Sequence, residues 1–65
     1  MKIGDYVVLR QDAEQINGAA IPHVVLGDFG PISRFVGLGK AEVNFLKSGL
    51  QMVDMSWIME FNPNE

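Results

Sequence analysis

The chain of 65 residues contains no cysteine and a single histidine, His23. Without cysteine it can form neither a disulfide nor a thiolate metal site, and a lone histidine has no second imidazole with which to share a metal ion. The glycine-rich segments 27–30 and 37–40 lack the spacing of a phosphate-binding loop. No pair of carboxylates is forced together by the sequence either. We therefore predict no catalytic residue, no cofactor and no metal, and a protein that is not an enzyme.

Positive charge and long apolar runs are also scarce. Five lysines and arginines stand against eight carboxylates, and the five are scattered singly along the chain. Proteins that bind nucleic acid usually concentrate their basic residues, so nucleic acid is not expected as a partner. No apolar stretch approaches the ~18 residues of a membrane span, and the N-terminal sequence turns acidic before an apolar run develops. We expect no membrane span and a cytoplasmic location, which the lack of cysteine also fits.

The clearest structural signal is a β-hairpin in the middle of the chain. Residues 41–45 alternate strictly between apolar and polar side chains, which is the period of a half-buried strand. Residues 32–36 are mainly apolar, and the two glycines of segment 37–40 suit a tight connection between two strands. The pattern predicts that Phe35 and Phe45 lie in the core.

Other elements follow from local signals, and all 65 residues form one domain. We predict strands at 3–10, 50–53 and 59–61, a short strand or extended flap at 23–26, a turn at 27–30, and a flexible tail at 62–65. A single helical turn is expected at 12–16, ended by Asn17-Gly18. A second helical or 3-10 turn is expected at 54–58, with Asp54 as its cap.

The C-terminal segment 46–61 has a second interpretation. Its large apolar residues also recur at intervals of three and four, which is the stripe of an amphipathic helix: Leu46, Leu50, Val53, Trp57 and Phe61. Gly49 within this stripe costs about 1 kcal/mol relative to alanine in a helix. The sequence is therefore compatible with two structures for this segment, namely strands separated by a turn or a single helix.

The order of these elements resembles an SH3-like small β-barrel. Lys2–Leu9, with its Gly4-Asp5 pair, is similar to the opening strand of KOW-type barrels, and segments 30–32 and 39–45 are similar to their middle strands. The resemblance implies an all-β fold of about five strands, with a long first loop and a 3-10 turn before the last strand. Some barrels of this kind, such as the stromal E subunit of photosystem I, are non-catalytic subunits that dock on larger complexes.

Two roles follow as expectations. The first is a protein–protein interaction module or accessory subunit that docks through an apolar surface, either on a partner protein or on further copies of itself. The alternative is a KOW-type domain that binds RNA or associates with the ribosome or with transcription, using four cations: Lys2, Arg10, Arg34 and Lys40.

The docking surface is predicted from the first strand and the long loop. If Val7 and Leu9 point inward, Tyr6 and Val8 point outward, because neighbouring side chains of a strand face opposite ways. The apolar loop and the C-terminal turn would complete the surface. The predicted partner-binding residues are Tyr6, Val8, Ile21, His23, Val25, Phe29, Met55 and Trp57.

Overall fold

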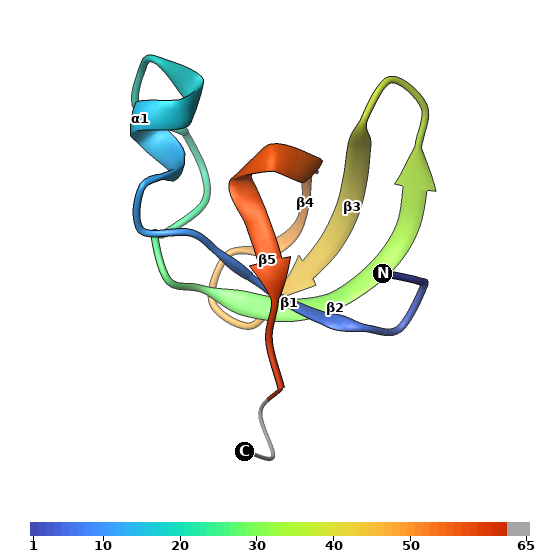
Figure 1. Ribbon diagram of the computed structural model, residues 1–65. Coiled ribbons are helices and arrows are strands. Elements are labelled where there is room, and N and C mark those ends of the chain that lie inside the picture. Colours follow the sequence, from blue (N-terminus) through green and yellow to red (C-terminus); the bar gives the residue numbers. More distant parts are fainter. Residues whose placement is uncertain (63–65) are drawn as a thin grey trace.

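The computed structural model describes residues 1–62 as an all-β domain (Figure 1). Its elements are β1 (Tyr6–Leu9), α1 (Ala13–Asn17), β2 (Phe29–Val36), β3 (Lys40–Phe45), β4 (Gly49–Asp54), the 3-10 turn η1 (Met55–Trp57) and β5 (Ile58–Glu60). All five strands belong to one antiparallel sheet with the order β4-β3-β2-β1-β5. The predicted class, with a 3-10 turn before the last strand, is confirmed. The alternative of one helix over 46–61 is wrong, since that segment forms a turn, β4, η1 and β5.

Strand β2 connects the two halves of the sheet. Its first three residues, 29–31, pair with β1, and its remainder, from Ile32 to Val36, pairs with β3. The register shifts between Ile32 and Arg34, so the strand carries an irregularity there, and such bulges bend a strand. Figure 1 shows β2 curving along the sheet, with β1 on one side and β3 on the other. The predicted turn at 27–30 is therefore partly wrong, because β2 already begins at Phe29, which pairs with Val8.

Gly30 allows β2 to approach β3 closely. A Cβ at this position would overlap the backbone oxygen of Asn44 and lie 2.7 Å from its carbonyl carbon. Any side chain would push the two strands apart, so the close crossing requires glycine.

The core lies on the inner face of the curved sheet. Val7, Leu9 and Val43 are fully buried, as their alternation predicts. Phe45 is buried as predicted, but the prediction for Phe35 is wrong, because this side chain is 45% exposed. β1 pairs only with the first residues of β2, so the far end of the β2–β3 hairpin, where Phe35 lies opposite Ala41, projects beyond the other half of the sheet.

The long connection between β1 and β2 covers part of the core. Helix α1 forms one residue later than predicted, and Gly18 ends it with a left-handed backbone at φ 82°. No strand forms at 23–26; this part of the loop instead makes turns, with Ile21 buried and Val24 and Leu26 packed against the core. The flap alternative describes it better than the strand alternative.

Two further expectations concern the ends and the membrane. Within residues 1–62, no helix has the length and apolar character needed to cross a membrane. The predicted flexible tail at 62–65 lies, apart from Asn62, outside the described residues.

Candidate functional site: an apolar patch on the outer face of the sheet

The outer face of β1 carries two apolar side chains, as predicted. Val7 and Leu9 are fully buried, so Tyr6 and Val8 point to the opposite face, where Tyr6 is 41% exposed. Side chains of paired residues lie on the same face of a sheet. The register of β1 with β2 and β5 therefore adds three apolar neighbours, with Pro31 opposite Tyr6, and Phe29 and Met59 opposite Val8.

Two residues beyond the strand ends extend this face. Phe61 donates its backbone N–H to the Tyr6 carbonyl at 2.9 Å, and its ring packs against Phe29 with 4.8 Å between ring centroids and 55° between ring planes. Leu46 donates its backbone N–H to the Phe29 carbonyl at 2.8 Å and leaves its side chain 70% exposed. We call the resulting surface the outer patch; it consists of Tyr6, Val8, Phe29, Pro31, Leu46, Met59 and Phe61.

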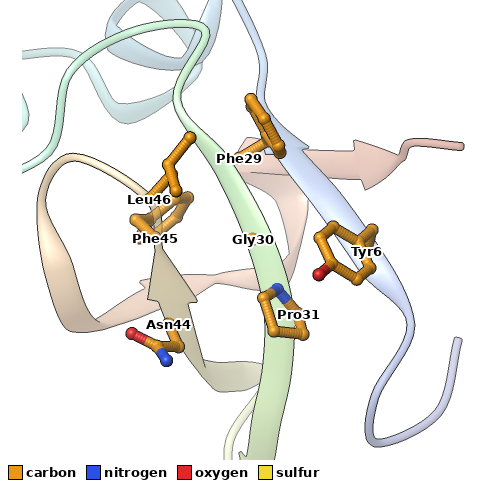
Figure 2. A pocket seen from close by; sticks show the side chains of 7 residues that line it. All are labelled: Tyr6, Phe29, Gly30, Pro31, Asn44, Phe45 and Leu46. Atoms are coloured by element: carbon orange, nitrogen blue, oxygen red, sulfur yellow. The ribbon is translucent and has the colours of Figure 1, made fainter. Parts of the chain in front are cut away.

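The outer patch contains a groove with a volume of about 410 Å³. Its lining residues are Tyr6, Phe29, Gly30, Pro31, Asn44, Phe45 and Leu46. Figure 2 shows Leu46 and Phe45 on one side of β2, Phe29 and Tyr6 on the other, and Gly30 and Pro31 between them. Gly30 lines the groove with its backbone alone. None of the seven lining residues carries a charge, so the groove offers apolar contact together with the polar groups of Tyr6 and Asn44.

A buried carboxylate positions one rim of the groove. Asp28, only 4% exposed, accepts hydrogen bonds from the backbone N–H groups of Phe29 (2.9 Å), Lys47 (3.2 Å) and Ser48 (2.9 Å), and from the Ser48 hydroxyl (2.8 Å). The first of these bonds holds the start of β2, and the others hold the turn that carries Leu46. Asp28 thus ties together the two segments from which Phe29 and Leu46 project.

The pKa of the Asp28 carboxyl is lower than its usual value. Burial by itself would raise this pKa, but the hydrogen bonds from the Ser48 hydroxyl and from the backbone of Ser48, Lys47 and Phe29 outweigh it. Asp28 therefore remains ionised at neutral pH, and within residues 1–62 its charge is stabilised by hydrogen-bond donors rather than by an ion pair. This role was not predicted from the sequence, because it depends on a turn about 20 residues away.

Surface cations are partly engaged by neighbouring carboxylates. Arg10 donates two hydrogen bonds of 3.0 Å to Asp12, and Arg34 donates two of 3.2 and 3.4 Å to Glu42. These are two of the four cations that the RNA-binding alternative would use. Each neighbouring carboxylate lowers the net positive charge that these two arginines present to a phosphate group.

Comparison of the chain with protein-family models, with curated proteins and with solved structures gave no match. The SH3-like resemblance consequently stays a prediction. Among residues 1–62, no three histidine, cysteine, aspartate or glutamate side chains come together in a way that would hold a metal ion.

The predicted partner-binding residues fall into three groups. Tyr6, Val8 and Phe29 lie together on the outer patch. Met55 and Trp57 are half-buried and pack against the core, and Ile21 is itself a buried core residue. These three therefore do not form a free surface with Tyr6, since the 3-10 turn and the loop use their apolar side chains to close the domain.

The remaining two predicted residues lie in the long loop. His23 is exposed and has a left-handed backbone with φ 70°, and Val25 is 56% exposed and donates its N–H to the Ser48 hydroxyl at 3.3 Å. Neither lines the groove.

Four residues of the outer patch were not predicted as partner-binding residues: Pro31, Leu46, Met59 and Phe61. Extending the hairpin register backwards from Ile32 and Val43 places Phe29 across from Leu46, so a sequence signal for Leu46 existed. Phe61 and Met59 depend on the pairing of β5 with β1, two strands at opposite ends of the chain. No local pattern contains that information.

Proposed function

We propose that this chain is a non-catalytic protein interaction module that docks on a partner protein through the outer patch. The observation that carries the proposal is an uncharged groove within an apolar surface, where Tyr6, Leu46 and Met59 are each 41–70% exposed. A domain of 65 residues has little interior, and contiguous exposed apolar surface in such a domain is typical of a binding site.

The occupant that suits the groove is a protein segment with an apolar side chain. Tyr6 and Phe29 supply large apolar surfaces with few rotatable bonds, a property of residues that dominate protein interfaces. Pro31 adds a rigid apolar wall, and the Asn44 side chain lies on the rim, where it can bond to a partner backbone. The ring contact of Phe29 with Phe61 and the Asp28 hydrogen bonds hold this surface in shape before binding, which lowers the entropy lost on association.

The test compares three variants of a tagged chain expressed in its own cell. Leu46→Lys places a charge on the outer patch, and Tyr6→Thr removes an aromatic ring from it while keeping a strand-forming residue. Leu38→Lys is the control: it makes the same leucine-to-lysine change at a residue that is 98% exposed on the tip of the β2–β3 turn. Proteins that copurify with the unaltered chain are quantified by mass spectrometry, and the fold of each variant is checked by circular dichroism.

We expect at least one protein to copurify in stoichiometric amount, to be reduced about tenfold or more by Leu46→Lys and by Tyr6→Thr, and to be retained by Leu38→Lys. A tenfold reduction corresponds to about 1.4 kcal/mol of binding free energy. Equal recovery from all three folded variants would show that the outer patch is not the docking surface.

A further inference from the structure

The sheet ends in two edge strands that differ in how well they are protected. β5 is only three residues long, and its Glu60 pairs with the N-terminal amino group at 3.6 Å. β4 is six residues long, contains no proline and no lysine, and carries one charge, Asp54, at its end. Short length, proline, bulges and charges are the usual devices that stop edge strands from pairing with other chains. β5 has two of these devices, and β4 has almost none.

The backbone of β4 presents a row of unpaired groups. The Met55 N–H donates to the Gly39 carbonyl at 2.8 Å. Hydrogen-bonded and non-hydrogen-bonded pairs alternate along antiparallel strands, so Val53, Gln51 and Gly49 belong to the hydrogen-bonded pairs of β4 with β3. Leu50, Met52 and Asp54 belong to the other pairs, and their N–H and C=O groups point away from β3. Among residues 1–62, no strand pairs with this side of β4, and none of the backbone bonds outside the strand pairs involves these three residues.

We propose that β4 pairs antiparallel with β4 of a second copy of this chain, which joins two sheets across a two-fold axis at Gln51. In this register Leu50 lies opposite Met52 of the second copy, and Met52 opposite its Leu50. Both side chains are exposed in the single chain, at 55% and 51%. The two-fold axis thus generates two identical apolar contacts between Leu50 and Met52, as a self-complementary interface requires.

Charge complementarity favours a second copy over an unrelated strand. Two charged side chains at the ends of β4 have opposite sign, with Lys47 in the turn before the strand and Asp54, which lies opposite Lys40 of β3, as its last residue. In this register Asp54 of each copy lies opposite Ser48 of the other, one residue from Lys47. Since the pairing is formed twice, each end of the joined strands brings one such pair of opposite charges together.

The absence of cysteine makes this register testable with a single introduced thiol. Gln51 lies on the axis, in a pair whose Cα atoms are about 4.5 Å apart in antiparallel sheets, within the range that a disulfide can bridge. Gln51→Cys loses only the hydrogen bond from the Gln51 amide to the Ser48 carbonyl (3.0 Å). Leu38→Cys, on the exposed tip of the β2–β3 turn, is the matched control for random collision between thiols.

We expect mild oxidation to cross-link Gln51→Cys at least tenfold faster than Leu38→Cys. Sedimentation equilibrium over a concentration series is expected to show a monomer–dimer equilibrium for the unaltered chain and for Leu38→Lys. Leu50→Lys is expected to raise the dissociation constant at least tenfold. Sodium chloride is expected to weaken the dimer, because Lys47 and Asp54 are at the solvent-exposed ends.

The proposal would be overturned by equal cross-linking of the two cysteine variants, by a monomer at every concentration, or by open aggregates in place of a dimer. If the chain forms no dimer and Leu50→Lys instead abolishes the binding of a different protein, the β4 edge pairs with a strand of that protein. This result would also overturn the proposal. The proposals for the β4 edge and for the outer patch can be refuted independently. Leu46→Lys is expected to leave the dimer intact, and Leu50→Lys is expected to leave the partner bound to the outer patch.

Discussion

Replacing Asp28 with asparagine tests whether a buried charge holds the groove together. The variant keeps the shape of the side chain but has one acceptor oxygen where the carboxylate has two, and it turns an amide N–H₂ group toward donors. Of the four donors around Asp28, about two lose their acceptor. Hydrogen bonds to a charged group contribute about 1.5–3 kcal/mol each, so we expect Asp28→Asn to lower the free energy of unfolding by about 3 kcal/mol.

That loss is large for a domain of this size. At 0.05–0.15 kcal/mol per residue, the whole chain is stable by roughly 3–10 kcal/mol. Urea unfolding at pH 7, followed by the fluorescence of the single tryptophan Trp57, measures the difference directly. The matched control is Asp12→Asn, which breaks an ion pair with Arg10 whose side chains are 42–48% exposed and which is expected to cost at most about 1 kcal/mol.

The pH dependence separates the charge of Asp28 from its shape. Because the folded protein lowers the pKa of this carboxyl, its stabilisation is complete above the unfolded pKa of about 3.9 and is lost as the pH falls through the folded pKa. The gap between the unaltered chain and Asp28→Asn is therefore expected to be constant from pH 7 to 5 and to narrow below pH about 4. A gap that persists unchanged in acid, or a cost no greater than that of Asp12→Asn, would refute the reasoning.

Two further substitutions test the sheet and the core. Gly30→Ala would force a Cβ into the Asn44 backbone, and we expect a loss of at least 2 kcal/mol together with a changed near-ultraviolet circular dichroism spectrum; a stable, unchanged protein would contradict the close crossing of β2 and β3. Leu9→Ala removes a fully buried side chain and is expected to cost about 2–5 kcal/mol in urea unfolding, whereas Leu38→Ala, at a position 98% exposed, is expected to stay within about 0.5 kcal/mol; similar values for the two would contradict the assigned core.

The most reliable information in the sequence was local alternation. Residues 41–45 read as a half-buried strand, and the structure buries Ala41, Val43 and Phe45 as that period requires. Alternation in β1 also placed Tyr6 outward. Asp54 was predicted to cap a short turn, and it accepts a hydrogen bond from the Ser56 N–H at 2.9 Å at the start of η1. Each of these features depends on neighbours within a few residues.

The errors about the core and about the docking surface concern contacts between distant segments. Phe35 has the composition of a core residue, but its exposure depends on where β1 stops pairing with β2. Met55 and Trp57 were placed on a surface with Tyr6, whereas the return of β5 to β1 turns them toward the core. The same pairing brings Phe61 onto Phe29, a contact between opposite halves of the chain.

The sequence by itself determined the all-β class, the position of the hairpin and the 3-10 turn, and the inner and outer faces of β1 and β3, because strand period and turn chemistry act between near neighbours. Only the tertiary structure decided which apolar side chains gather into one surface. The groove exists because Gly30 lets β2 cross close to β3 and because the Asp28 carboxylate fixes a turn about 20 residues further along the chain. Such long-range packing and hydrogen bonding is specified by the whole chain at once, and no short segment carries it.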